Sequence, residues 1–200
     1  TRALRHASEI NGIRKVVYLS VLGAAVDSGN ACFSSKAKAE RILTESVVSS
    51  SILRVPMVLG ANDHASRAIA KRASSTIAFA FRASSLEQPI DVDDVIAAVI
   101  ACMESSIAGV LCLAGPASLS RRMLYERAGF HGLLISLPIW LGMIVAGLLE
   151  RVSDTPPMTG AMLGVLDHDD NIGVDACAQK LGITLTSLDE TLKKILPSLD

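Results

Sequence analysis

Aromatic residues are scarce in this chain of 200 residues: Phe, Trp and Tyr together make up 4% of it, although 50% of the residues are hydrophobic. The core must therefore be built from Ala, Val, Leu and Ile, which suits helices packed on buried parallel strands. An excess of either charge is also lacking, because the formal net charge is −1 at pH 7. That balance gives no electrostatic reason to expect nucleic acid as a partner.

Metal-binding patterns are missing as well. The four cysteines form no Cys-x-x-Cys pair and the four histidines do not cluster. We therefore expect no metal site, and reduced thiols in a cytosol-like compartment. Cys102 and Cys112 stand in apolar runs and are predicted to be small core residues. Residues 1–15 are charged and amphipathic, so we expect no secretory signal there.

Two glycine motifs are absent. The sequence contains neither G-x-G-x-x-G nor G-x-x-G-x-x-G, the turns whose N–H groups meet a dinucleotide's pyrophosphate at a helix N-terminus. It also lacks the G-x-S-x-G turn that carries the nucleophile of many hydrolases. These residues alone therefore predict no complete dinucleotide site and no serine hydrolase.

Strand-like aliphatic runs alternate with helical stretches, which favours a parallel α/β sheet. Strands are predicted at residues 15–20, 51–55, 109–113 and 133–137. Helices are predicted at 1–11, 34–48, 64–81, 93–104, 119–127, 158–166, 175–181 and 187–196. Asp91 or Asp93 is expected to cap the fourth helix and Ser118 the fifth, and Ser187 with Glu190 fits a capping box.

One apolar stretch is long enough to raise the question of a membrane span. Residues 132–149 carry no charge over 18 residues, which is the lower limit for a spanning helix. Pro138 divides the stretch into a piece of strand length and a helix that begins at the proline. A buried strand followed by a helix is therefore favoured, with a membrane span as the alternative.

Several stretches together resemble one protein superfamily. They are VVYLSVLGA, SKAKAERIL, SILRVPMVLG, PIDVDDVIAAVIACM and LAGPASLSRRML. These residues resemble the atypical short-chain dehydrogenase/reductase superfamily of NAD(P)-binding epimerases and dehydratases. The tail pieces PPMTGAMLGVLDHDDN and KLGITLTSLDETL are most similar to the branch that contains the nucleotide-binding accessory subunit of respiratory complex I.

The resemblance implies an α/β fold: a partial Rossmann-like parallel sheet with flanking helices and a small C-terminal helical region. Residues 1–130 would form the C-terminal part of a Rossmann-like NAD(P)-binding domain. Residues 131–200 would form a strand/helix extension and a helical C-terminal subdomain. Because family members carry the glycine-rich turn and several strands before the equivalent of Thr1, one edge of this sheet is expected to be bare.

The resemblance also implies site residues. Ser20 falls at or next to the catalytic serine and Lys36 at the catalytic lysine, and both would also contact the cofactor. Cys32 stands where the family has its catalytic tyrosine. A tyrosine serves as proton donor when a nearby lysine lowers its pKa, whereas a cysteine thiol reaches several ångströms less far from the backbone.

The cofactor would make further contacts after the second strand. There the resemblance places Pro56, Met57 and Val58 on the nicotinamide side of NAD(P). It implies no metal.

Ordinary structural roles explain some of these residues equally well. Lys36 could stand on a polar helix face beside Lys38 and Glu40, and Ser20 could simply form a turn. The acidic run 167–170 is expected to be a solvated loop.

Three functions follow from these observations. The first is an NAD(P)-binding dehydrogenase/epimerase-like protein that is catalytically impaired and structural, similar to the complex I accessory subunit. The alternatives are an active NAD(P)-dependent reductase, epimerase or dehydratase, and a non-enzymatic interaction module. The partners implied are the nucleotide and either complex I subunits or further copies of the chain, with contact at the membrane periphery. The cellular location implied is the bacterial cytoplasm or the matrix side of the mitochondrial inner membrane.

Overall fold

The main sheet is parallel and has the strand order β1-β2-β7, formed by β1 (Lys15–Val21), β2 (Ser49–Val55) and β7 (Gly109–Cys112). The computed structural model describes residues 1–61, 63–153, 156 and 158–196. The register of β1 on β2 runs from Lys15 opposite Ser49 to Val21 opposite Val55, so both strands end at the same edge. The predicted parallel α/β fold is confirmed.

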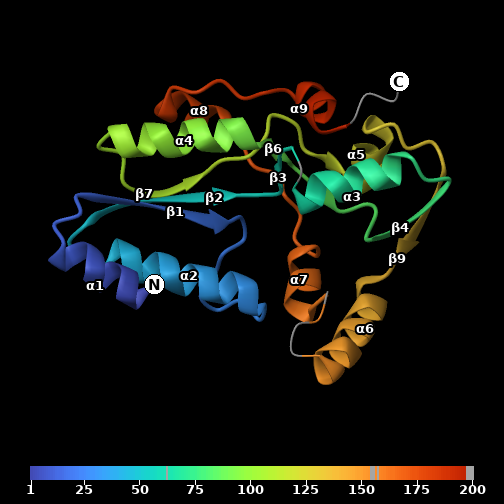
Figure 1. Ribbon diagram of the computed structural model, residues 1–200, viewed down its shortest axis with the longest axis horizontal. Helices are drawn as coiled ribbons and strands as arrows, with labels where there is room; N and C mark the ends of the chain where they lie inside the picture. The colour runs from blue at the N-terminus through green and yellow to red at the C-terminus, as the bar shows by residue number, and fades with distance from the viewer. Residues whose placement is uncertain (62, 154–155, 157, 197–200) are drawn as a thin grey trace.

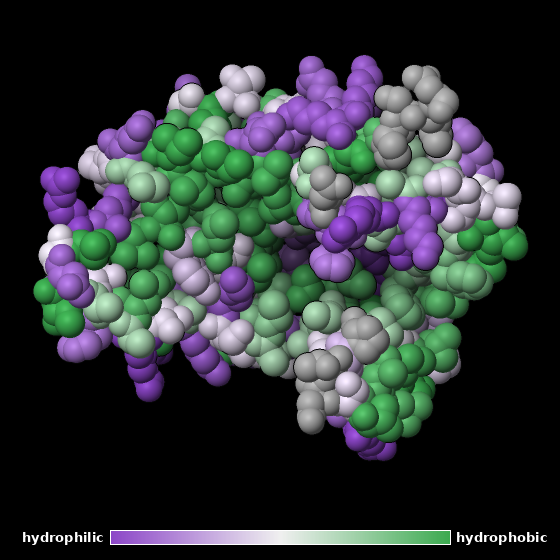
Figure 2. Space-filling model, viewed as in Figure 1, coloured by the Kyte–Doolittle hydropathy of each residue, from purple (hydrophilic) through white to green (hydrophobic). Residues whose placement is uncertain are grey.

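Helices cover both faces of this sheet (Figure 1). α1 (Arg2–Ile10) and α2 (Ala31–Thr44) lie on one face, and α4 (Val92–Glu104) and α8 (Asp175–Leu181) lie on the other. The central strand β2 is the best buried, with Ile52 and Leu53 fully enclosed. Within the described ranges, no strand pairs with the free side of β1. Exposed apolar side chains gather over α4 and the strands beside it (Figure 2), among them Ile96, Ile100 and Met103.

Residues 58–137 add three short strand pairs. Parallel pairs join β3 (Val58–Leu59) to β6 (Ile90–Asp91) and β4 (Ile77–Phe81) to β9 (Leu133–Leu137). An antiparallel pair joins β5 (Leu86–Glu87) to β8 (Leu119–Ser120). A hydrophobic core forms here between α3 (His64–Ala73), α5 (Arg121–Arg127), α9 (Leu188–Ile195) and the β4–β9 pair.

The uncharged stretch folds as a strand followed by a helix, as the sequence predicts, but the expected burial was wrong, because Leu133, Trp140 and Ile144 are exposed. β9 ends at Leu137, Pro138 follows as N-cap, and α6 (Ile139–Val152) begins at once and projects with α7 (Gly160–Val165) beside it (Figure 1). Among the residues described, the structure has no helix of the length and apolarity that a membrane crossing requires.

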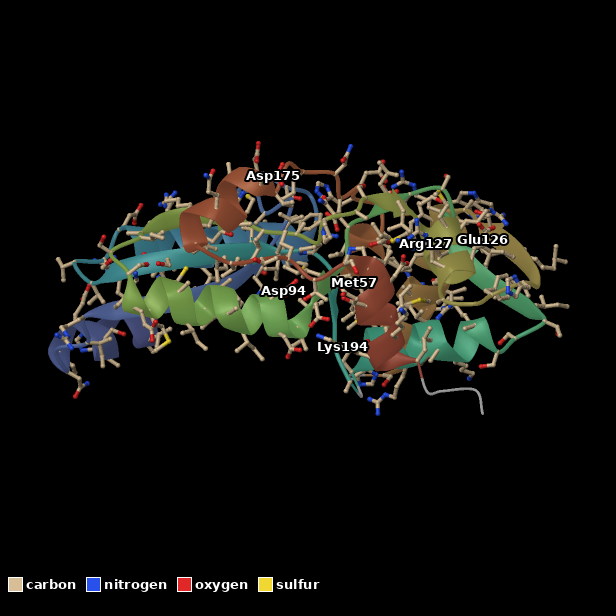
Figure 3. The ribbon with its side chains drawn as sticks, turned by 90° about the horizontal axis from the view of Figure 1, so that it is seen from above. Met57, Asp94, Glu126, Arg127, Asp175 and Lys194 are labelled. Carbon is tan, nitrogen blue, oxygen red and sulfur yellow. The ribbon has the colours of Figure 1, made fainter. Side chains whose placement is uncertain are left out.

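The C-terminal tail is anchored on the N-terminal end of α4. Thr186 donates from its N–H (2.7 Å) and its hydroxyl (2.8 Å) to the carboxylate of Asp94. Asp91 caps α4 and accepts hydrogen bonds from Thr191 and Lys194, each at 3.0 Å. Figure 3 shows Lys194 on α9 close to the end of α4 that carries Asp94. The predicted cap at Asp91 is therefore confirmed, and so is the capping box of α9.

Two helix predictions were wrong in their bounds. The helix expected at 64–81 ends at Ala73, and residues 77–81 form β4 instead. In this strand the odd positions are exposed or half-buried and Ala78 and Ala80 are buried, so period-two burial overrides the helix propensity of alanine. The helix expected at 34–48 begins at Ala31, because the Asn30 side chain accepts the N–H groups of the first turn, and it ends at Thr44.

Two smaller predictions were also wrong. The N-cap of α5 is Ser120, whose hydroxyl accepts the Met123 N–H at 3.2 Å, and not Ser118. Cys112 is exposed at the end of the edge strand β7, whereas Cys102 is fully buried as predicted. An apolar run alone does not tell which face of an edge strand meets the core.

We predict that Asp94→Ala lowers the free energy of unfolding by about 1–3 kcal/mol, because both Thr186 donors lose their acceptor. Urea unfolding measures the change. The matched control is Asp93→Ala, which removes an exposed carboxylate that pairs with Lys194 and should cost less than about 1 kcal/mol. Equal losses for the two variants would contradict this anchoring.

Candidate functional site

A buried carboxylate fixes the position of the predicted serine. Ser20 is 2% exposed near the end of β1, and its hydroxyl donates to Glu40 of α2. Glu40 is itself 4% exposed and receives Arg54 of β2 through Nη2 at 2.6 Å and Nε at 3.0 Å. The expected polar face for Glu40 was therefore wrong: this carboxylate ties α2 to both β1 and β2. The Ser20 hydroxyl takes part in that link.

Lys36 points back from α2 to β1. Its Nζ donates to the Leu19 carbonyl oxygen at 3.1 Å and lies 5.2 Å from the centre of the Tyr18 ring. Cys32 lies one turn earlier on α2, half-buried, and its N–H donates to the Asn30 side chain at 2.8 Å. The three predicted catalytic residues thus stand on two adjoining elements, and their roles stay predictions.

A pocket of about 180 Å³, which we call the sheet-end pocket, lies where β1 and β2 end. Pro56 and Met57 line it, together with Phe33 from α2. Val58 does not line it but packs into the core beside β6. In open α/β sheets, ligands bind outside the carboxyl ends of the strands, so the position of this pocket is that of a ligand site.

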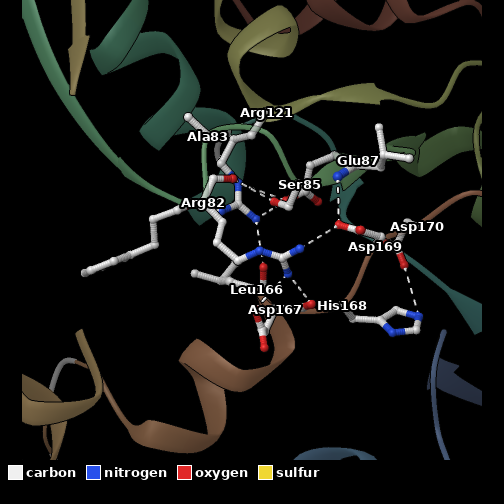
Figure 4. Close-up of polar contacts among 12 residues, drawn as sticks. Arg82, Ala83, Ser85, Glu87, Arg121, Leu166, Asp167, His168, Asp169 and Asp170 are labelled. Atoms are coloured by element: carbon white, nitrogen blue, oxygen red, sulfur yellow. Dashed lines mark hydrogen bonds and ion pairs between the residues drawn. The ribbon is translucent and has the colours of Figure 1, made fainter. Parts of the chain in front are cut away.

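His168 and Asp170 of the acidic run 167–170 line the sheet-end pocket, and Figure 4 shows the polar contacts that hold the run. Arg82 donates to the Asp167 carboxylate at 2.8 Å, and the Leu86 N–H donates to Asp169 at 3.0 Å. The Asp170 N–H donates to the Leu86 carbonyl oxygen at 3.0 Å. The run is a loop with Asp167 and Asp169 exposed, as expected, but Asp170 is shielded from solvent because the run is held against β5.

Asp170 turns its carboxyl group into the sheet-end pocket, where its side chain is 14% exposed. Burial, reinforced by the negative charges of Glu87 and Asp169, raises the pKa of Asp170 to about 6, although His168 acts in the opposite direction. The His168 Nε2 lies 3.8 Å from Asp170 Oδ1. A carboxyl group with this pKa gains and loses its proton near neutral pH, as an acid–base group must.

His168 is held by its neighbours. Its ring meets the Phe33 ring edge-on at 5.5 Å between centroids. A Cβ at Gly23 would lie 2.9 Å from the imidazole, and the backbone of Gly23 has φ +76°. Glycine is needed at residue 23 on both counts.

Glu87 completes the polar wall. Its carboxylate receives Arg121 through Nε at 2.9 Å and through Nη2, and both side chains are buried. Sequence reasoning missed Glu87, His168 and Asp170 because they come from distant segments. The acidic run 167–170 was the sequence signal that could have pointed to His168 and Asp170. Among the residues described, no three His, Cys, Asp or Glu side chains are grouped to hold a metal ion.

Comparisons with known proteins bear on the fold. No family model and no curated protein matches the sequence. Solved structures do match. A nucleoside-diphosphate-sugar epimerase from Staphylococcus aureus has a TM-score of 0.71 at 15% identity, over 95% of this chain and 68% of that one. An NADPH-dependent quinone oxidoreductase from Escherichia coli has a TM-score of 0.71 at 17% identity, over 96% and 71%.

A third match is an enzyme of Bordetella bronchiseptica solved in complex with NAD⁺, with a TM-score of 0.68 at 14% identity, over 96% of this chain and 64% of that one. This chain has their fold. The fold is the one that the resemblance to NAD(P)-binding epimerases and reductases predicts, and none of these three matches points to the complex I branch.

We predict that Asp170→Asn raises the free energy of unfolding at pH 8 and changes it little near pH 4. The folded pKa of about 6 lies above the usual 3.8, so the native state binds the extra proton and the stability contributed by Asp170 falls as pH rises through 6. Urea unfolding across this range measures the difference, with exposed Asp27→Asn as control. A pH-independent difference would refute the assignment.

We also predict that Glu40→Ala lowers the free energy of unfolding by about 3–5 kcal/mol, because Arg54 and Ser20 lose a buried partner. At the C-terminal end of the same helix, the cap residue Glu45 pairs with Arg41 in solvent, and Glu45→Ala should cost less than about 1 kcal/mol. Chemical denaturation compares the two. Similar costs would show that the buried link does not hold α2 in place.

Proposed function

We propose that the protein binds a nicotinamide nucleotide at the ends of β1 and β2 and uses it to stabilise a fold rather than to catalyse hydride transfer. The observation that carries the proposal is Cys32 four residues before Lys36, on a helix of the matching fold. The neighbours that bind NAD⁺ or depend on NADPH support the cofactor class.

The nicotinamide side of the cofactor fits the residues present. Met57 and Pro56 line the sheet-end pocket, and Lys36 lies on the adjoining helix with Nζ at the end of β1, where it could exchange the Leu19 carbonyl for a ribose hydroxyl. The pyrophosphate side does not fit, because no glycine-rich turn exists in these 200 residues. We propose that a segment bearing this turn adds its strand to the free side of β1.

At the tyrosine position that the resemblance names, the chain carries a thiol instead of the phenol that would donate the proton. Hydride transfer to a carbonyl needs such a donor beside the developing alkoxide. The Ser20 hydroxyl already donates to Glu40, and the Cys32 thiol is shorter than the phenol it would replace. Nucleotide bound here would add stability by mass action, since only the folded state holds it.

The finer part of the proposal is a likeness to the complex I accessory subunit. The tail motifs support it, and in the structure they include α7, the first turns of α9 and the clamped run 167–170. On α6 the side chains of Trp140, Ile144 and Leu148 are exposed and could meet complex I subunits, further copies or the membrane periphery. The compartment would be the bacterial cytoplasm or the mitochondrial matrix side.

One observation favours an active enzyme instead. Asp170 titrates near pH 6 inside the sheet-end pocket and could replace the tyrosine as acid–base group. In that case Asp170→Asn would abolish turnover of a carbonyl or sugar-nucleotide substrate. Under the structural proposal there is no turnover to abolish.

Calorimetric titration of the natural full-length protein with NADPH and NADH tests the proposal. We expect binding of one of them, weakened roughly tenfold by Lys36→Ala because a cationic hydrogen-bond donor is lost. Lys38→Ala, exposed on the same helix, should leave binding unchanged. No binding of either nucleotide would overturn the cofactor assignment, and turnover would overturn the structural role.

A further inference from the structure

A second pocket, of about 230 Å³, opens between α3, β4 and α5, and we call it the apolar pocket. Ile69, Phe81, Leu124 and Leu137 are among its lining residues. Ligand pockets commonly enclose about 300–1,000 Å³, so this one suits a small molecule. A mostly apolar wall favours a ligand with an apolar body.

Two arginines line the apolar pocket, and they differ in how far their charge is neutralised. Arg121 is paired with the buried carboxylate of Glu87. Arg72 donates to the Ala68 carbonyl oxygen at 3.0 Å and lies 5.3 Å from the centre of the Tyr125 ring. Across the described part of the chain, no carboxylate forms an ion pair with Arg72. Helix α3 also carries Arg67 and Lys71 outside the pocket and contains no acidic residue, so no carboxylate of this helix offsets the charge of Arg72.

Tyr125 supplies a polar group beside this charge. It lines the apolar pocket at 7% exposure, and among the described residues its hydroxyl has no hydrogen-bond partner. Burial raises the pKa of Tyr125. The phenol therefore stays neutral at physiological pH, with its O–H free to donate to an anion.

We propose that the apolar pocket binds a small carboxylate with an apolar body, its head group on the Arg72 guanidinium and the Tyr125 hydroxyl. The apolar body lies against the wall formed by Ile69, Leu124 and Leu137. The single positive charge of Arg72 matches the single negative charge of the ligand carboxylate. A nucleoside diphosphate would leave its ribose and base polar groups unpaired against this wall. The site uses α3 and α5 and does not depend on nucleotide binding.

Octanoate is a suitable probe, titrated by calorimetry into the protein without any nucleotide. We expect octanoate to bind, and octanol and acetate to bind at least tenfold more weakly, since each lacks either the charge or the apolar body. Arg72→Gln should weaken octanoate binding roughly tenfold. Arg67→Gln, an exposed change on the same helix outside the pocket, should not.

A second variant keeps the test independent of charge. Ala68→Leu fills the apolar pocket from α3 and should abolish octanoate binding while thermal unfolding stays cooperative. Octanoate binding that both Arg72→Gln and Ala68→Leu leave intact would overturn the proposal. So would tighter binding of uridine diphosphate than of octanoate in the same assay. Because no NAD(P) is present in these titrations, their outcomes do not depend on whether NAD(P) binds.

Discussion

The carboxylate of Glu40 is the interaction on which the candidate site depends. It reaches from α2 into the sheet and is met there by Ser20 of β1 and Arg54 of β2. A buried charge is tolerated only while its partners stay in place, so this link fixes how α2 lies across the two strands. That placement in turn sets Cys32 and Lys36 beside the end of β1. Ser20 stands at the position that the resemblance assigns to catalysis, and in the structure its hydroxyl helps to hold Glu40 in place.

The C-terminal tail shapes both pockets. Leu166 follows α7 and lines the sheet-end pocket and the apolar pocket alike, as Met57 does from the end of β2. The run 167–170 is held against β5 by Arg82 and by backbone bonds with Leu86. The two pockets are therefore neighbours with different chemistry. One carries the carboxyl group of Asp170, and the other carries Arg72, which has no carboxylate partner among the described residues, over an apolar wall.

Much of the fold could be predicted from the sequence, for identifiable reasons. The strand at 133–137 was predicted with its bounds, because a short aliphatic run stops at Pro138. The start of α2 was missed because it depends on the Asn30 side chain, and β4 was missed because IAFAF follows an alanine-rich helix. The predicted contacts Pro56 and Met57 do lie in a pocket, since they follow a buried parallel strand. His168 and Asp170 could not be placed, because their position depends on how the tail packs.

The most direct test of nucleotide binding at this edge of the sheet is amide hydrogen exchange of the natural full-length protein, with and without NADPH. Exchange should slow at Val21, Leu22, Met57 and the first turn of α2, where the two strands end. Exchange in α8, which lies against α4 on the side away from α2, should not change. Unchanged exchange at the ends of β1 and β2 with saturating NADPH would contradict nucleotide binding at this site.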